Sequence, residues 1–154
     1  MCADTGALFV INDRADMAML LDSALHVGQD DLPPGVARRL IGADRVLGFS
    51  THNEMQLRAA AAEPVDYVAL GPIFGTVSKR HPDPVVGLVE LRRLRALAKT
   101  PVVAIGGITL ATAQDVMNAG AESIAVIGDL FPEACTLQNL RSRAEEWLRV
   151  FSHE

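Results

Sequence analysis

Three side chains that could bind phosphate follow the apolar run at residues 66–70: Thr76, Ser78 and Lys79. The run predicts a buried strand, and the Gly-Pro pair that comes next ends it because proline has no N–H for a sheet. Hydroxyl and ammonium groups are donors of the kind that hold phosphate oxygens. This pattern is short, and by itself it is more typical of a polar surface loop than of a phosphate site.

Two aspartates, Asp13 and Asp31, also follow apolar runs, with the amide side chains of Asn12 and Gln29 nearby. Two carboxylates from neighbouring strand ends can hold Mg²⁺ when substrate phosphates complete its octahedral shell. An aspartate in such a place can instead cap the helix that follows. The spacing leaves metal binding and capping open for Asp13, and it favours capping for Asp30.

The third candidate is made of backbone rather than side chains. Gly106 and Gly107 follow an apolar run and precede a predicted helix. Consecutive glycine N–H groups and the positive end of a helix dipole both favour a phosphate. Gly128, one strand later, can add another N–H. We interpret the isolated His26 and His52 as structural residues.

Composition limits the classes of protein to which the chain can belong. Its 154 residues fit one domain, 1–154, and its hydrophobic content of 49% is typical of a well-packed α/β interior. The formal charge of −5 argues against nucleic-acid binding, which usually needs a basic face. No apolar run reaches the ~20 residues of a membrane-spanning helix, and the first residues do not read as a signal peptide. We therefore expect a soluble, cytoplasmic protein.

Predicted strands and helices alternate along the whole chain. The predicted strands are 7–11, 25–27, 45–49, 66–70, 101–105 and 123–127. The predicted helices are 16–21 with Asp16 as its cap, 33–41, 53–62 with Asn53 or Thr51 as its cap, 89–98, 112–119 and 133–150. Alternation of this kind requires a parallel sheet joined by right-handed crossovers.

Two parallel architectures fit this alternation. An open doubly wound sheet is complete with five or six strands, whereas a TIM (β/α) barrel needs eight. Spacing alone favours the open sheet. Polar residues or glycines follow all six predicted strands, however, and a barrel draws its site from nearly all strand ends. We therefore predict an incomplete TIM barrel of about six of eight βα units.

Taken in order, these motifs resemble the thiamine phosphate synthase and TenI superfamily. The resemblance covers nearly the whole chain and rests on Asn12-Asp13, Gly28-Gln29-x-Asp31, Ser50-Thr51-His52, Gly71-Pro72-Ile73-Phe74, Thr76-x-Ser78-Lys79 and Gly106-Gly107. It implies a transferase that joins hydroxymethylpyrimidine diphosphate to thiazole phosphate and releases diphosphate. The tautomerase of the superfamily has a histidine where Pro72 stands, which favours the synthase.

The resemblance also implies a role for each matching residue. Asp13 and Asp31 would bind Mg²⁺. The pyrimidine diphosphate would contact Asn12, Ser50 and Lys79, and Ser50 and Lys79 would act in catalysis. The thiazole phosphate would contact Thr76, Ser78, Gly107, Ile127 and Gly128. Magnesium and Lys79 would stabilise the departing diphosphate, after which the thiazole nitrogen attacks a pyrimidine carbocation.

The chain departs from the family at its N-terminal side, where strands one and two of the barrel and a Gln-x-Arg-x-Lys motif are not found. Unpaired strand edges favour association with another chain, so we expect a homo-oligomer. Without those cations the diphosphate should bind weakly. The alternative function is therefore a non-catalytic or degenerate TenI-like binder of thiazole phosphate.

Overall fold

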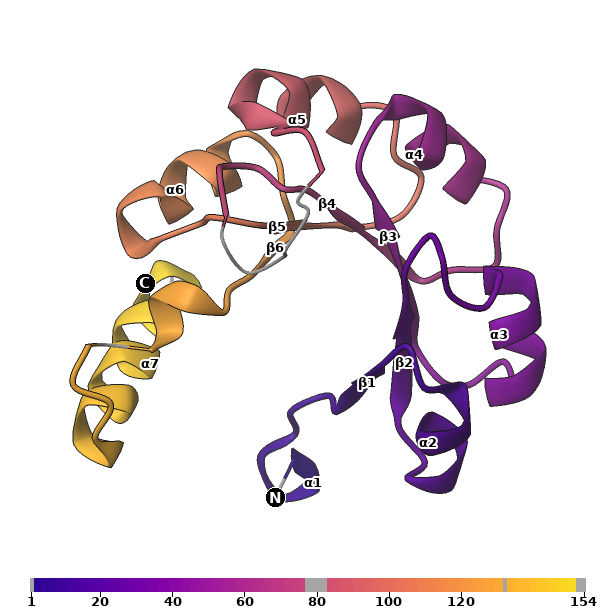
Figure 1. Cartoon of the computed structure of the whole chain (residues 1–154), viewed down its shortest axis with the longest axis horizontal. Coiled ribbons are helices and arrows are strands. Elements are labelled where there is room, and N and C mark those ends of the chain that lie inside the picture. The colour runs from indigo at the N-terminus through magenta and orange to yellow at the C-terminus, as the bar shows by residue number, and fades with distance from the viewer. Residues whose placement is uncertain (1, 77–82, 132, 152–154) are drawn as a thin grey trace. The chain divides into compact units, whose positions relative to one another are not determined.

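The computed structural model describes residues 2–76, 83–131 and 133–151, in which strands and helices alternate (Figure 1). The strands are β1 (Val10–Asn12), β2 (Ala24–Val27), β3 (Leu47–Thr51), β4 (Tyr67–Leu70), β5 (Val102–Ile105) and β6 (Ser123–Ala125). The helices are α1 (Cys2–Thr5), α2 (Ala15–Leu20), α3 (Pro34–Ile41), α4 (Glu54–Ala60), α5 (Gly87–Arg95), α6 (Leu110–Asn118), the 3₁₀ helix η1 (Gly128–Leu130) and α7 (Leu137–Phe151). None of these helices is long and apolar enough to cross a membrane.

The strands form one six-stranded sheet in the order β1-β2-β3-β4-β5-β6. The pairs β1–β2, β2–β3 and β5–β6 are parallel, with Ile11 opposite Leu25 and Val103 opposite Ser123. Each connection therefore returns the chain to the same end of the sheet, which is the βα alternation expected from the sequence. The α/β class is confirmed.

The chain divides into two compact units. The first unit comprises Met1–Ala69 and Leu97–Val102, and the second comprises Leu70–Ala96 and Val103–Glu154. The predicted site residues divide between them: Asn12, Asp13, Asp31 and Ser50 belong to the first unit, and Thr76, Gly107, Ile127 and Gly128 to the second. The single domain over residues 1–154 stays a prediction.

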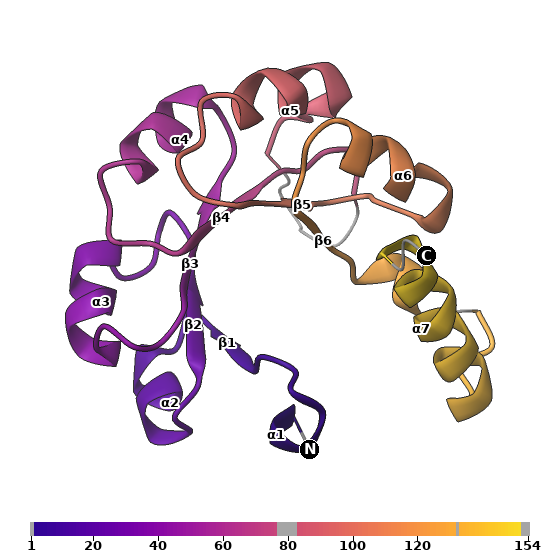
Figure 2. The same ribbon diagram turned by 180° about the vertical axis from the view of Figure 1, so that it is seen from behind.

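In the first unit, α2 and α3 lie on one face of β2 and β3 (Figures 1 and 2). Leu25 is opposite Leu47 in register, and both side chains are fully buried. Side chains alternate between the two faces of a strand, so the next side chain of β2, His26, points to the other face, where it lies opposite Gly48 of β3. The register thus separates an apolar face, packed by helices, from a face that carries polar groups.

Two N-terminal predictions are wrong. β1 begins only at Val10, and Leu8 and Phe9, predicted as buried strand residues, are 61% and 46% exposed. Asp16 does not cap α2, because Arg14 stands at the N-cap and Asp16 is already inside the first turn. Instead the Arg14 guanidinium binds the Asp16 carboxylate and lowers the pKa of that carboxyl to about 2. By contrast, Asn53 caps α4 as predicted, accepting the Gln56 N–H at 3.0 Å.

In the second unit, α5 begins two residues earlier than the predicted helix 89–98 and ends three residues earlier, and it buries Leu91 and Leu94. α6 begins two residues earlier than predicted, because the Thr112 hydroxyl accepts the Thr109 N–H at 3.0 Å and stabilises the first turn. α7 packs on α6 (Figure 2) and buries Trp147.

Candidate functional site

The carboxyl end of β1 places Asp13 in a tight turn. Asp13 has φ 64°, a left-handed conformation that aspartate adopts more readily than most residues. Its N–H donates to the carbonyl of His26 at 2.8 Å, and the Arg14 N–H donates to the carbonyl of Asn12 at 2.8 Å. The turn therefore ties the end of β1 to β2, which brings Asn12 and Asp13 beside the strand that precedes Asp31.

Asp31 closes the loop that follows β2. Its Oδ2 accepts the Gly28 N–H at 2.7 Å, so the carboxylate turns back toward the strand end. Burial lowers the pKa of His26, and the negative charge of Asp31 opposes that shift. The carboxylate therefore lies close enough to the His26 ring to act on its charge.

Ser50 is the predicted site residue with the most developed surroundings. Its Oγ lies 2.9 Å from Nε2 of His26, and Nδ1 of the same ring lies 3.0 Å from the Tyr67 hydroxyl. The Gln29 side-chain amide donates to the Ser50 carbonyl at 2.5 Å. Sequence reasoning treated His26 as structural and gave Tyr67 no role, whereas both belong to the network around Ser50.

The two residues after Ser50, Thr51 and His52, make hydrogen bonds to other parts of the first unit. The Thr51 hydroxyl is buried and donates to the carbonyl of Ala69 at 3.0 Å, which joins β3 to the end of β4. The His52 N–H donates to the Gln56 side chain at 2.7 Å, at the start of α4. Of the predicted Ser50-Thr51-His52 run, Ser50 therefore joins the His26 and Tyr67 network, whereas the Thr51 hydroxyl bonds to Ala69.

In the second unit, the loop after β4 lies against the loop after β5. The N–H groups of Ile73 and Phe74 donate to the carbonyls of Ile105 and Gly106 at 2.9 and 3.0 Å. Gly107 has φ 65°, and an added Cβ would lie 2.4 Å from the Gly75 carbonyl oxygen. A side chain at Gly107 would therefore collide with the backbone that leads into Thr76.

The predicted phosphate site at the start of α6 already contacts a carboxylate of the chain. Asp129, next to Gly128, accepts the Leu110 N–H at 3.2 Å and the indole N–H of Trp147 at 3.0 Å. Asp129 thus connects the end of β6 to the first turn of α6 and to α7. Sequence reasoning missed this contact, and the only signal for it was a carboxylate beside a predicted ligand glycine.

Four predicted site residues remain, and the structure describes two of them. Gly128 begins η1, and the side chain of Ile127 is 60% exposed. Ser78 and Lys79 lie outside the described residues. In the part of the chain that the structure describes, no three His, Cys, Asp or Glu side chains gather as they would around a metal ion. A site of two carboxylates completed by substrate phosphates has fewer protein ligands than that, so Mg²⁺ stays a prediction.

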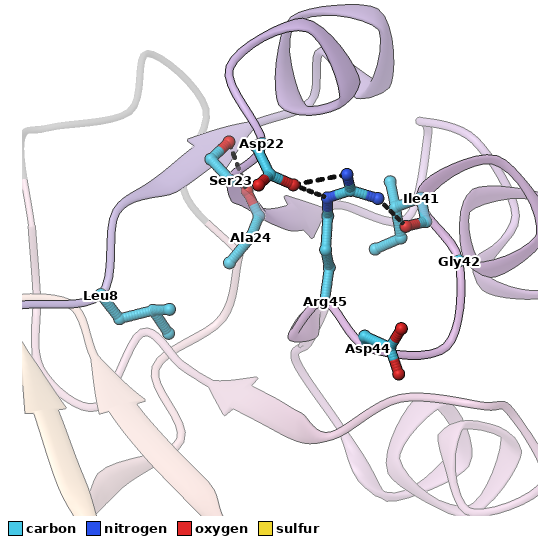
Figure 3. A pocket seen from close by; sticks show the side chains of 8 residues that line it. All are labelled: Leu8, Asp22, Ser23, Ala24, Ile41, Gly42, Asp44 and Arg45. Carbon is cyan, nitrogen blue, oxygen red and sulfur yellow. Dashed lines mark hydrogen bonds and ion pairs between the residues drawn. The ribbon is translucent and has the colours of Figure 1, made fainter. Parts of the chain in front are cut away.

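A cavity of about 420 Å³ lies at the opposite, amino end of the first unit's strands (Figure 3). It is lined by Leu8, Asp22, Ser23, Ala24, Ile41, Gly42, Asp44 and Arg45. Asp22 and Arg45 face one another across one wall, with Nη2 of Arg45 2.5 Å from the carboxylate, and Arg45 also donates to the carbonyl of Ile41. The charges of this pair are therefore matched within the chain.

A second arginine stabilises the same end of the strands. The Arg38 guanidinium donates to the carbonyls of Pro64 at 3.0 Å and Arg45 at 2.6 Å, and to the carboxylate of Asp66 at 2.6 Å. The same carboxylate accepts the Leu47 N–H at 2.7 Å. Arg38 therefore links α3 to the segments that lead into β3 and β4.

Comparison with known proteins shows the family to which the chain belongs. A family model described as thiamine monophosphate synthase matches residues 1–130. The chain belongs to this family. Among curated relatives, the thiamine-phosphate synthase of Koribacter versatilis is 50% identical over 142 residues, and that of Methanoculleus marisnigri is 44% identical over 140 residues. The Prochlorococcus marinus protein of the same name is 43% identical over 147 residues.

The chain matches these members of the thiamine monophosphate synthase family over part of their length. The matches cover 92%, 90% and 92% of this chain but 64%, 66% and 41% of the Koribacter, Methanoculleus and Prochlorococcus proteins. The chain thus spans less than two thirds of each of these relatives.

A solved structure of the same family supports the match. Thiamine phosphate pyrophosphorylase from Pyrococcus furiosus superposes with a TM-score of 0.81 at 29% identity, covering 98% of this chain and 72% of that one. A 3-hexulose-6-phosphate synthase superposes with a TM-score of 0.58 at 17% identity, covering 86% of this chain and 66% of that one, which is a likeness of fold alone.

Proposed function

We propose that the chain is the part of a thiamine-phosphate synthase that binds and orients hydroxymethylpyrimidine diphosphate and thiazole phosphate for their joining. The observation that carries the proposal is the setting of Ser50, at a parallel strand end, between the His26 ring and the Gln29 amide. Ligands of parallel α/β sheets bind at this end of the strands. Relatives at 43–50% identity that bear the synthase name support the assignment.

Asp13 and Asp31 are the residues that would hold Mg²⁺, together with oxygens of the diphosphate. The donor set fits the ion, because both residues are carboxylates that follow neighbouring strands, and Asp31 accepts the Gly28 N–H through Oδ2. When bound, the ion neutralises charge on the departing diphosphate. Asn12, beside Asp13, would donate to the same diphosphate, as would Lys79.

The reaction needs orientation more than proton transfer. The bond between the pyrimidine methylene carbon and the diphosphate oxygen breaks, and its electron pair leaves with the diphosphate. The lone pair of the thiazole nitrogen then forms the new carbon–nitrogen bond, so no proton has to move. Ser50 would contact the pyrimidine diphosphate, and Thr76, Ser78, Gly107, Ile127 and Gly128 would hold the thiazole phosphate in reach.

The finer architecture is part of the proposal. The six parallel βα units would belong to a TIM (β/α) barrel, and the TM-score of 0.81 against the Pyrococcus enzyme supports this. A homo-oligomer remains a prediction that sedimentation can test.

The first test is product formation by this chain from both substrates with Mg²⁺. Calorimetry of each substrate separately tells the proposal from its alternative, because Mg²⁺-dependent binding of the pyrimidine diphosphate supports the synthase. Binding of thiazole phosphate alone would instead support a degenerate binder. If the chain forms no product and does not bind the pyrimidine diphosphate, the proposal is wrong.

The sequence offers a matched pair of variants for this test. Asp13 and Asp22 are the two non-glycine residues with positive φ among those described, at 64° and 51°. Asparagine tolerates this conformation, so both substitutions remove a carboxylate without backbone strain. Asp13→Asn should weaken Mg²⁺-dependent binding about tenfold or more, whereas Asp22→Asn, at the amino end, should not change it.

A further inference from the structure

Three side chains from three consecutive strands of the first unit form one hydrogen-bonded chain. The Tyr67 hydroxyl lies 3.0 Å from Nδ1 of His26, and Nε2 of His26 lies 2.9 Å from Oγ of Ser50. The two rings are stacked, with centroids 5.5 Å apart and planes inclined by 27°. Both ring nitrogens of the histidine are therefore in use.

The tyrosine reaches the histidine across a strand that has no side chain at that point. Gly48 of β3 is opposite His26 in register and lies between β2 and β4. An added Cβ at Gly48 would lie 2.1 Å from Cζ of Tyr67 and 2.5 Å from Nδ1 of His26. The contact exists because the middle strand leaves this space to the two rings.

Two arrangements of protons are compatible with these distances. A neutral imidazole carries one N–H, which can be on Nε2 or on Nδ1. If it is on Nε2, it donates to Ser50, Tyr67 donates to Nδ1, and the serine proton is left for a ligand. If it is on Nδ1, Ser50 must donate to Nε2, and the serine then offers a ligand only lone pairs.

The chemistry of the donors favours the first arrangement. A phenol is a far stronger acid than an aliphatic hydroxyl, so it is the better donor to an imidazole nitrogen, and its oxygen is the poorer acceptor. At pH 8, above the ordinary pKa of an imidazole and below that of a phenol, the ring is neutral and the phenol keeps its proton.

We propose that Tyr67 is a positioning residue that fixes the Nε2–H tautomer of His26 and so turns the Ser50 hydroxyl proton toward an acceptor atom of the bound pyrimidine diphosphate. The part that concerns the ligand rests on the proposed function. The part that concerns the tautomer belongs to the free protein. Tyr67 and His26 act through Ser50 and do not touch the substrate in this scheme.

The tautomer is measured first, in the free protein at pH 8, by long-range ¹⁵N–¹H correlation of the histidine rings. His26 is one of four histidines, so its signals are assigned by their loss in His26→Asn. Protonation on Nε2 in the wild type, with a shift toward Nδ1 in Tyr67→Phe, is the expected result. Protonation on Nδ1 in the wild type, or an unchanged tautomer in Tyr67→Phe, would overturn the inference.

The effect on the ligand is measured next, by calorimetry of the pyrimidine diphosphate with Mg²⁺. Tyr67→Phe should weaken binding about tenfold, and it should have no further effect in a Ser50→Ala background, because both changes remove the same bond. Thiazole phosphate binding should not change. Ser23→Ala removes a hydroxyl at the amino end of the strands, where Ser23 donates to the Ala24 carbonyl, and serves as the matched control.

The tautomer measurement and the calorimetry distinguish a failure of the proposed function from a failure of the inference about Tyr67. If the wild type binds no pyrimidine diphosphate, the proposed function fails, while the tautomer of His26 still decides the positioning role of Tyr67. If the tautomer shifts as expected but the effects of Tyr67→Phe and Ser50→Ala simply add, Tyr67 does not act through the Ser50 hydroxyl and the inference is wrong.

Discussion

The two ends of the first unit's strands differ in how they use polar side chains. The amino end has the cavity of about 420 Å³, and its charged wall is an ion pair whose Asp22 side chain is 85% exposed. The carboxyl end holds part-buried, mostly neutral groups in a continuous chain from Tyr67 through His26 to Ser50. Open space alone therefore does not mark the candidate site. Polar groups that are part-buried and held in one orientation mark it better.

Arg38→Met should have the largest effect, and it should be on stability alone. The substitution removes donors from the carbonyls of Pro64 and Arg45 and from the carboxylate of Asp66, while the Arg38 side chain is only 16% exposed. We expect a loss of about 2–4 kcal/mol in the free energy of unfolding, measured by urea denaturation. Substrate affinity of the folded fraction should be unchanged. A selective loss of affinity would contradict the distinction between the amino end and the candidate site at the carboxyl end.

Gly48→Ala should affect both stability and binding. The new methyl group would overlap Tyr67 and His26 and force the two rings apart, which we expect to cost about 1–3 kcal/mol of stability. Pyrimidine diphosphate binding should fall with it. Gly35→Ala is the control, because its Cβ would meet Glu63 and Arg39 at ordinary distances of 3.7 and 4.0 Å. Equal stability and equal binding of the two variants would show that the Tyr67–His26 contact across Gly48 is unimportant.

Asp31→Asn should weaken Mg²⁺-dependent binding of the pyrimidine diphosphate by about tenfold, because it removes a hard anionic ligand. The asparagine oxygen can still accept the Gly28 N–H, so the loop should keep its conformation. Chelation of Mg²⁺ should weaken wild-type binding and have little effect on the variant. Asp30→Asn is the neighbouring control, and calorimetry that ranks it with Asp31→Asn would argue against a ligand role for Asp31.

Asp22→Asn should have the smallest effect. It removes the charge that pairs with Arg45, and both side chains are partly or mostly exposed, so solvent screens the pair. We expect less than about 1 kcal/mol of lost stability, shrinking further as salt is added to the denaturation series. An effect as large as that of Arg38→Met would mean that the exposed pair, and not the Arg38 bonds, stabilises this end.

The sequence predicts well what depends on neighbouring residues. The strand at residues 25–27, the helix at 33–41 and the Asn53 cap all rest on local patterns, and the structure confirms each to within one residue. The start of β1 was misjudged because an apolar run predicts burial only where other elements cover it, and Leu8 and Phe9 remain exposed.

The surroundings of the candidate site depend on distances across strands, which no local pattern contains. His26 and Tyr67 are 41 positions apart and meet only because of the register of β2 with β3 and the absence of a side chain at Gly48. The contact of Asp129 with Trp147 and the first turn of α6 likewise joins three separate elements. The sequence could name Ser50 as a candidate, but it could not supply the partners that orient it.

Trp147 is the only tryptophan in the chain, and its indole N–H is bonded to a carboxylate that also touches the first turn of α6. Indole emission is sensitive to charge and hydrogen bonding at the ring nitrogen. The intrinsic fluorescence of the protein is therefore a built-in optical probe of Asp129, and titrations of the second unit can be followed without any added label.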